Sequence, residues 1–294
     1  MKANSVKIFI WVLLVTLTSC KSDIWNYFSY ETPSVEQRFA TSMEYNNTHG
    51  YAVIKVPDGN YRIFVCSDTH LQGTANHFRR FIQLYHDDPD CPVAVHCGDL
   101  VESDESYDFF MSAVNETPAP AGKKDTLFVT PGNHDIFFSQ WSGFVKHWPT
   151  STYYFTIEAQ DSTHTKDLYI SLDSAHGTLG KAQMNWLRDL LASSFSEYRH
   201  IIVFTHVNLF RRDNTKGHIS NFPIEESTEL MGLFTKYHVK QVWTGHDHTR
   251  EEFSIGGVTY IIIDRMKDLD PNASYMILHV GDQLENIFGI IFVI

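Results

Sequence analysis

Short apolar runs alternate with helical patterns along most of the chain. Residues 61–65 form an apolar run rich in β-formers, and Phe78, Phe81, Ile82 and Tyr85 follow at the i, i+3, i+4 and i+7 spacing of an amphipathic helix. The same succession recurs further along. The predicted strands are 61–65, 92–95, 126–129, 153–157, 168–172, 201–204 and 239–243, and the predicted helices are 78–85, 106–114, 181–195 and 225–237.

Beyond residue 249 the pattern contains strands alone, at 253–255, 258–263, 275–280 and 287–293. An α/β part followed by a β-rich end predicts two packed sheets with helices on their outer faces. Neither an internal repeat nor a change of composition divides residues 51–294. The sequence therefore predicts one large α/β domain over 51–294.

The first 19 residues have the composition of a secretory signal peptide. Lys2 and Lys7 accompany an apolar stretch at 8–17 that is too short to span a bilayer. The sequence LTSC at 17–20 resembles the lipobox of bacterial lipoproteins, which implies cleavage before Cys20 and a lipid on its sulfur. The alternative is an ordinary signal peptide followed by a coincidental cysteine.

Residues 20–50 follow as a polar and aromatic segment without sustained periodicity. We interpret this segment as a lipid-anchored tether that joins the fold near 33–45, where PSVEQRFATSMEY predicts a short helix. These features predict an exported lipoprotein of the bacterial cell envelope, held on a membrane by the acyl chains of Cys20 and without a spanning helix. The sequence carries no signal for an oligomeric state.

The chain is acidic, with 35 Asp and Glu residues against 23 Lys and Arg and a formal net charge of −12. Signal-peptide cleavage would remove Lys2 and Lys7 and no acid, so the mature chain would be more acidic still. Such a surface does not attract nucleic acid, and we expect no nucleic-acid partner. An odd number of cysteines remains after Cys20, which argues against a complete disulfide framework; Cys66 and Cys97 are expected to be small buried residues.

Five of the predicted strands end in a short polar group of one kind. The groups are Ser67-Asp68-Thr69-His70, Gly98-Asp99, Gly132-Asn133-His134-Asp135, Thr205-His206 and Gly245-His246-Asp247-His248. Each group alone is ordinary turn chemistry. Because ligand sites in α/β sheets lie beyond the carboxyl ends of the strands, we expect the five groups to converge on one site.

The donors in these groups are oxygen and imidazole nitrogen, and no thiolate is needed. This set suits Mn, Fe or Zn in a reactive centre better than a structural zinc site, which usually recruits cysteine. Two Asp, four His and one Asn exceed the needs of one ion. We therefore expect two divalent metal ions, bridged by one carboxylate, in a centre that still attracts phosphate.

The ordered set of motifs is similar to that of the calcineurin-like metallophosphoesterases, whose signature runs D-x-H, G-D, G-N-H-D/E, H and G-H-x-H. The similarity covers residues 61–249. It implies the fold of that family, a four-layer α/β/β/α sandwich of two mixed sheets. It also implies a small phosphorylated substrate.

Carried over to this sequence, the resemblance implies a role for each motif residue. The first metal would be bound by Asp68, His70 and His248, the second by Asn133, His206 and His246, and both by the bridging Asp99. His134 would contact the phosphoryl oxygen or protonate the leaving group, and Asp135 would orient its imidazole. The nucleophile would be a metal-bound hydroxide.

Two further observations concern the substrate. The segment 98–102 lacks the metal-binding tyrosine of purple acid phosphatases, and the bare pattern is most similar to the compact phosphodiesterases of the cyclic-nucleotide type. Segment 207–222 follows His206 and has little periodicity, so it is either a solvated loop or a substrate-contacting one. In the second case Arg211, Arg212 and His218 would contact the substrate beyond its phosphate.

These inferences predict dinuclear-metal-dependent hydrolysis of phosphate monoesters or diesters at the cell envelope. One alternative is a nuclease or a phospholipid-headgroup phosphatase with the same site, and the acidic chain disfavours the nuclease. Another is a non-catalytic, metal-containing surface binding protein. The presence of both His134 and Asp135 disfavours it, because binding alone requires neither a proton donor nor a residue that orients one.

Overall fold

The computed structural model describes residues 32–124, 126–137, 140–209 and 222–291, with only the backbone of Ser194. One compact unit, Pro33–Ile294, contains every helix and strand described below. The predicted signal peptide, Cys20, and the three rim residues Arg211, Arg212 and His218 lie outside the described residues. Within the described part of the chain, no helix has both the length and the apolar character that crossing a membrane requires.

The elements follow one another in the alternating order that the hydrophobic pattern predicts. The helices are α3 (Val35–His49), α4 (Asn76–Asp87), α5 (Ser106–Asn115), α6 (Trp141–His147), α7 (Gly180–Ser194) and α8 (Ile224–Lys236). The strands are β1 (Ala52–Val56), β2 (Tyr61–Cys66), β3 (Val93–His96), β4 (Leu127–Val129), β5 (Tyr153–Ala159), β6 (Lys166–Ser171), β7 (His200–Phe204), β8 (Gln241–Thr244), β9 (Glu251–Ile255), β10 (Val258–Ile262), β11 (Ser274–Val280) and β12 (Leu284–Ile290).

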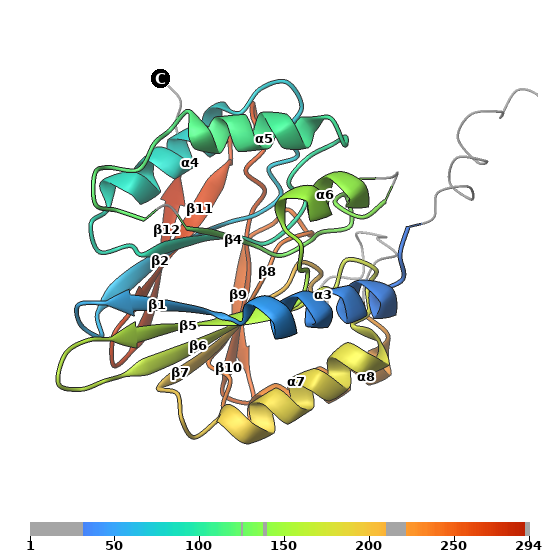
Figure 1. Ribbon diagram of the computed structural model, residues 1–294, viewed down its shortest axis with the longest axis vertical. Helices are drawn as coiled ribbons and strands as arrows, with labels where there is room; N and C mark the ends of the chain where they lie inside the picture. Colours follow the sequence, from blue (N-terminus) through green and yellow to red (C-terminus); the bar gives the residue numbers. More distant parts are fainter. Residues whose placement is uncertain (1–31, 125, 138–139, 210–221, 292–294) are drawn as a thin grey trace, which may run out of the picture. The chain divides into compact units, whose positions relative to one another are not determined.

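These strands form two mixed sheets (Figure 1). The larger sheet has seven strands in the order β1-β5-β6-β7-β8-β10-β9, and the smaller has five in the order β12-β11-β2-β3-β4. In the smaller sheet β2, β3 and β4 are parallel, and in the larger sheet β6, β7 and β8 are parallel. Both sheets therefore have a block of parallel strands whose carboxyl ends can carry a site.

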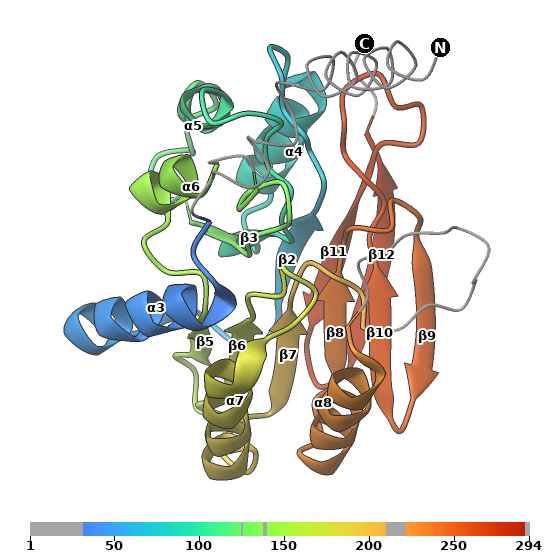
Figure 2. The same ribbon diagram turned by 90° about the vertical axis from the view of Figure 1, so that its right-hand side faces the viewer.

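Helices cover the outer face of each sheet, which gives the predicted four-layer α/β/β/α sandwich (Figure 2). One apolar cluster joins α4, α5 and α6 to the smaller sheet, and a second joins α7 and α8 to the larger. A third cluster lies between the sheets, where Val65, Val95 and Trp243 are fully buried. A strand that is buried on both faces has a nearly continuous run of apolar residues. These strands could therefore be predicted from the sequence.

Two elements were not predicted. Strand β1 is an edge strand whose first three side chains are exposed or half-buried, so its sequence AVIKV lacks the apolar run of a central strand. Helix α6 has seven residues and contains Gly143, which leaves no full helical period to detect. Tertiary packing determines both elements, as is common for short segments.

Helix α3 lies within the compact unit Pro33–Ile294. Ser34 and Gln37 form a capping box at its start, as the sequence S-x-x-Q permits. The helix then buries Arg38, whose guanidinium binds Asp173 with two hydrogen bonds of 2.7 and 2.8 Å. Because the side chains of this ion pair have no exposed surface, α3 is held firmly to the segment that follows β6.

Candidate metal centre

All five predicted polar groups follow the carboxyl ends of parallel strands. Three of them follow β2, β3 and β4 of the smaller sheet, and two follow β7 and β8 of the larger. The seven predicted metal ligands are brought together there, although they span residues 68 to 248. The centre thus lies where strand ends of both sheets meet.

The first group of side chains is Asp68, His70, Asp99 and His248. Nε2 of His248 lies 3.1 Å from Oδ1 of Asp68 and 3.2 Å from Nε2 of His70. Nε2 of His70 lies 3.7 Å from a carboxylate oxygen of both Asp68 and Asp99. These atoms point at one another, which is the arrangement of donors around a cation.

The second group is Asn133, His206 and His246, again with Asp99. Nε2 of His206 lies 3.1 Å from Oδ1 of Asn133, 3.2 Å from Nδ1 of His246 and 3.3 Å from Oδ2 of Asp99. Asp99 therefore borders both groups, in the position predicted for a bridging carboxylate.

The backbone at these residues adopts a conformation that side chains usually avoid. Eight non-glycine residues have positive φ in the part of the chain that the structure describes. Five of them are predicted ligands: Asp68, His70, Asp99, His246 and His248, with φ between 44° and 68°. Such left-handed residues cost free energy and cluster at functional sites, where the surrounding fold holds them.

Two motif glycines are required by close approach rather than by flexibility. A β-carbon on Gly132 would lie 2.2 Å from Oδ1 of Asp99, and one on Gly245 would lie 1.9 Å from Oγ of Ser67. Both distances are far below van der Waals contact. Gly132 and Gly245 let the loops approach closely enough for the ligands of different strands to meet.

The electrostatic field in the centre favours a positive charge. Burial raises the pKa of Asp99, but the charge and hydrogen bond of His206 outweigh it and lower that pKa to about 2. Burial lowers the pKa of His206, whereas Asp99 raises it to about 10. Burial and the neighbouring His206 lower the pKa of His246 to about 4. Two buried carboxylates thus stabilise positive charge at this point.

A backbone carbonyl group orients the imidazole of His206. Its Nδ1 lies 2.8 Å from the carbonyl oxygen of Cys97, to which it donates. That contact leaves Nε2 to face Asn133, His246 and Asp99. A backbone carbonyl that fixes the tautomer in this way is the usual support of a metal-binding histidine.

The spacing of the donors fits metal ions. An ion bound at about 2.0–2.1 Å by imidazole nitrogen places neighbouring donor atoms about 3.0–3.4 Å apart. The contacts of 3.1 to 3.3 Å in both groups match this range, and the 3.7 Å contacts of His70 lie just beyond it. The described chain therefore contains His/Asp clusters that could bind metal ions.

His134 lies beside the two groups. Its backbone N–H donates to Oδ1 of Asp99 at 2.8 Å, and its ring meets the edge of the His70 ring with centroids 4.6 Å apart. About a third of its side chain is exposed, at 34 %. The imidazole is thus at the open side of the centre, where it can meet a substrate.

The predicted contact between Asp135 and the His134 imidazole is not formed. Asp135 is fully buried, and its carboxylate accepts four hydrogen bonds: from the N–H groups of Asp99, Leu100 and Gly132 and from the Tyr107 hydroxyl, at 2.8 to 3.1 Å. Each of its two oxygens accepts two of these bonds. Asp135 holds together the turns that carry the ligands, and its acceptor capacity is used there.

Glu102 is the carboxylate that faces His134 instead. Its Oε2 lies 3.4 Å from Nδ1 of His134, and its Oε1 lies 3.4 Å from Nδ1 of His70 and 2.9 Å from Nζ of Lys267. Burial raises the pKa of Glu102, but Lys267 and the two histidines together lower it below its usual range. Sequence analysis missed Glu102, because an acid three residues after Asp99 in a loop has no pattern that distinguishes it.

The chain matches the family model described as calcineurin-like phosphoesterase over residues 61–250, which is more than half of its length. No curated protein matches it. The match begins at β2 and ends just after the last predicted ligand, His248.

Several solved structures share the fold at low sequence identity. A dimetal phosphatase from Danio rerio superposes with a TM-score of 0.59 at 11 % identity, covering 79 % of this chain and 99 % of that one. The GAP50 anchor of the inner membrane complex of Plasmodium gives 0.58 at 13 %, covering 78 % and 84 %. A purple acid phosphatase from yellow lupin (Lupinus luteus) gives 0.57 at 15 %, covering 78 % and 51 %.

Proposed function

The chain belongs to the calcineurin-like phosphoesterase family and is a metal-dependent hydrolase, and from that premise we propose that it hydrolyses small phosphate monoesters or diesters at the cell envelope. The observation that carries the proposal is the convergence of seven donor side chains beside the partly exposed imidazole of His134. The family relationship supports phosphoester chemistry in general. The substrate and the location are the parts that we propose.

We assign the ligands as two sets that share Asp99. Asp68, His70 and His248 would hold one divalent ion, and Asn133, His206 and His246 the other, with Mn, Fe or Zn as the candidate metals. When bound, two such ions activate water for attack and neutralise charge on the phosphoryl group.

The other role in the proposed reaction, toward the leaving oxygen, belongs to side chains of the protein. The His134 imidazole is placed to donate a hydrogen bond or a proton to the leaving oxygen of the ester. Its Nδ1 faces Glu102, so the opposite nitrogen, Nε2, is the one free to meet the substrate. The Glu102 carboxylate, 3.4 Å from Nδ1, is placed to hold the imidazole in the orientation in which Nε2 meets the leaving oxygen.

The proposed location is supported by the N-terminal sequence alone. The LTSC motif predicts a lipid on Cys20, and residues 21–32 would join that anchor to the domain that begins at Pro33. Attached acyl chains would hold the domain at a membrane surface. Mass spectrometry of the protein from a bacterial membrane fraction tests this part: an unmodified mature N-terminus would exclude the anchor.

The central experiment combines metal analysis with paired substrates. We would purify the chain from Lys21 onward, measure bound metal, and compare a phosphate monoester with a diester in the presence of Mn, Fe or Zn. We expect hydrolysis of at least one ester by protein that holds about two ions per chain. His134→Ala is expected to lower kcat by about 10²- to 10⁴-fold while metal content stays unchanged.

Two variants complete this experiment. Asp99→Ala is expected to lose bound metal as well as activity, because it removes the carboxylate that both ligand groups share. His49→Ala serves as the matched control, since His49 is an exposed histidine at the end of α3, remote in the sequence from every motif. Hydrolysis of neither ester by metal-loaded protein would refute the proposed function. The alternative of a non-catalytic, metal-containing surface binding protein would then be favoured.

A further inference from the structure

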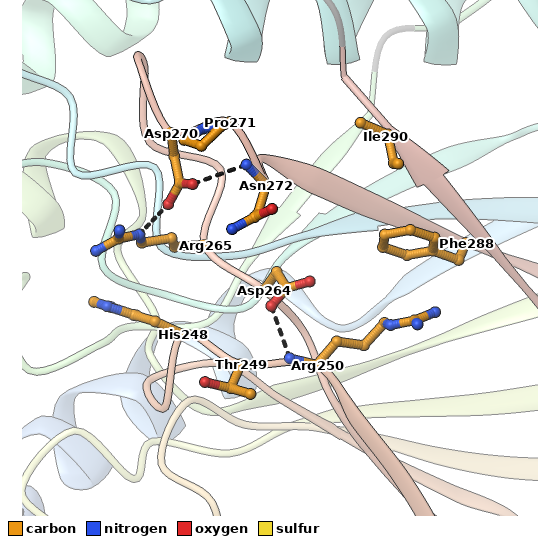
Figure 3. A pocket seen from close by; sticks show the side chains of 10 residues that line it. All are labelled: His248, Thr249, Arg250, Asp264, Arg265, Asp270, Pro271, Asn272, Phe288 and Ile290. Carbon is orange, nitrogen blue, oxygen red and sulfur yellow. Dashed lines mark hydrogen bonds and ion pairs between the residues drawn. The ribbon is translucent and has the colours of Figure 1, made fainter. Parts of the chain in front are cut away.

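A cavity lies beside His248, one of the predicted metal ligands. Its volume is about 430 Å³. The wall consists of His248, Thr249, Arg250, Asp264, Arg265, Asp270, Pro271, Asn272, Phe288 and Ile290 (Figure 3). His248 is both a predicted metal ligand and part of this wall, so the cavity borders the metal centre.

Most of the cavity wall lies outside the part of the chain that matches the family. The match ends at Arg250, whereas Asp264 to Asn272 come from the connection between β10 and β11, and Phe288 and Ile290 from β12. The predicted ligands therefore lie within the family match, together with Thr249 and Arg250, whereas the rest of the cavity wall follows it in the sequence.

Both carboxylates of the cavity hold its wall together. Oδ1 of Asp264 accepts the backbone N–H of Arg250 at 2.7 Å, and its Oδ2 accepts the Ser274 hydroxyl at 3.2 Å. Asp270 accepts Nε of Arg265 and, at 2.9 Å, the backbone N–H of Asn272. These bonds tie the segment after His248 to the β10–β11 connection, and Arg265 balances the charge of Asp270.

Arg250 takes part in these bonds through its backbone N–H and not through its guanidinium. The guanidinium lies 3.9 Å from the centroid of the Phe288 ring, and no carboxylate of the described residues comes within 4 Å of its nitrogens. Figure 3 shows Arg250 and Phe288 on the side of the cavity away from His248 and Arg265. Stacking on an aromatic ring holds a guanidinium in place and leaves its N–H edge available for an anion.

We propose that this cavity receives the leaving group of the phosphoester and selects leaving groups that carry a second anionic group, which Arg250 binds. The proposal rests on the proposed function, since it places the reacting phosphoryl group at the metal centre. A carboxylate and a second phosphate share the required chemistry, because either accepts two parallel hydrogen bonds from a guanidinium. Phe288, Pro271 and Ile290 would contact the carbon skeleton between the two anionic groups.

The test measures binding, so that it does not depend on turnover. Non-hydrolysable ω-carboxyalkyl phosphonates of increasing chain length are titrated calorimetrically into the metal-loaded protein, alongside the matched ω-carboxamides and the α,ω-bisphosphonates. At the best chain length, the carboxylate is expected to bind about tenfold more tightly than the carboxamide. Comparison of the carboxylate with the bisphosphonate then shows which anion the cavity prefers.

Variants assign this preference to Arg250. Arg250→Gln is expected to remove the tenfold preference for carboxylate over carboxamide, and Phe288→Leu to reduce it by about threefold through loss of the stacked ring. Arg188→Gln is the control, because Arg188 is a partly exposed arginine on α7 that pairs with Glu229. That variant should bind every phosphonate as the wild type does.

The outcomes separate this proposal from the proposed function. Equal binding of acids and amides at every chain length, or an unchanged preference in Arg250→Gln, would overturn the selection by Arg250, even if esters are hydrolysed. A retained preference in a protein that hydrolyses no ester would refute the proposed function and leave the anion site standing. Failure of all the phosphonates to bind would overturn the cavity proposal outright.

Discussion

At the scale of single side chains, the two acids near His134 have different partners. Asp135 accepts four hydrogen bonds from the loops that carry the ligands, while Glu102 contacts the imidazoles of His134 and His70. The first acid is therefore a structural residue of the centre. The second is a positioning residue for the predicted proton donor.

This difference predicts opposite phenotypes for two isosteric variants. Glu102→Gln is expected to lower kcat about 10- to 100-fold with little change in melting temperature, because it removes the charge beside His134. Asp135→Asn is expected to lower the free energy of unfolding by about 1–3 kcal/mol, because an amide NH₂ would face backbone N–H donors. Steady-state kinetics, metal analysis and thermal denaturation of both variants provide the measurement. An unchanged kcat in metal-loaded Glu102→Gln would contradict the assigned role.

The buried His96 is held neutral by its hydrogen bonds. The Thr69 hydroxyl donates its one proton to the carbonyl of Leu100 at 2.8 Å, so the 3.0 Å contact with His96 requires Nε2–H as the donor. Nδ1 then accepts the backbone N–H of Gly98 at 3.2 Å and has no room for a proton. In agreement, burial lowers the pKa of His96 to about 3. This imidazole fixes the turns that present Asp68, His70 and Asp99.

The neutral His96 predicts a specific pH dependence of stability. Its folded pKa lies below the ordinary value of about 6.5, so on acidification the unfolded chain binds a proton first. The contribution of neutral His96 to the free energy of unfolding is complete above pH 6.5. It is lost as the pH falls toward about 3. Relative to His96→Gln, the wild type should lose up to about 1.4 kcal/mol per pH unit in that window. Urea denaturation of both proteins with chelator present measures this, and parallel pH profiles would contradict it.

At the scale of elements, α3 is connected to the centre through one buried ion pair. Arg38 binds Asp173, which is near Ser174, and Oγ of Ser174 accepts the backbone N–H groups of His206 and Val207 at 3.1 and 2.9 Å. The helix therefore supports the loop that presents a predicted metal ligand.

Breaking this ion pair is expected to be costly. Arg38→Leu would leave the Asp173 carboxylate buried without its cation, and we expect a loss of about 3–5 kcal/mol in the free energy of unfolding. The double variant Arg38→Leu/Asp173→Leu should recover part of that loss, because it removes the uncompensated charge as well. Thr41→Ala, at an exposed position of the same helix, is the control. Additive losses in the double variant would show that the pair contributes no coupling.

At the scale of the whole molecule, the centre joins the two sheets. Its ligands come from β2, β3 and β4 on one side and from β7 and β8 on the other, and Asp68 and Asp99 are fully or almost fully buried. Bound cations would compensate these charges and cross-link the carboxyl ends of both sheets. Folding and metal binding are therefore expected to be coupled.

Metal removal should consequently destabilise the entire domain. Ligand binding at about 100 times its Kd contributes about 2.7 kcal/mol, and for a domain of this size each kcal/mol shifts the melting temperature by about 2–4 °C. Chelation with EDTA is thus expected to lower the melting temperature by about 5–10 °C, and readdition of the metal should restore it. Asp99→Asn should show a much smaller response to EDTA. An equal response in that variant would indicate metal binding elsewhere.

Much of this architecture is determined by patterns of neighbouring residues and could therefore be predicted from the sequence. The strands are apolar runs and the helices amphipathic patterns, because each is buried on a defined face. The five polar groups could be located for the same reason, since each directly follows a strand. Family membership and the four-layer fold rest on these local patterns, and both are confirmed.

The sequence by itself therefore determined which residues lie at the strand ends and which chemistry their side chains offer. Only the tertiary structure decided which of them face one another: that Glu102 rather than Asp135 contacts His134, and that Arg250 lines a cavity with Phe288. The physical reason is the distance along the chain over which each interaction acts. Hydrophobic periodicity acts over a few residues, whereas the partners of a carboxylate or guanidinium are chosen by distances between loops that the packing of two sheets sets.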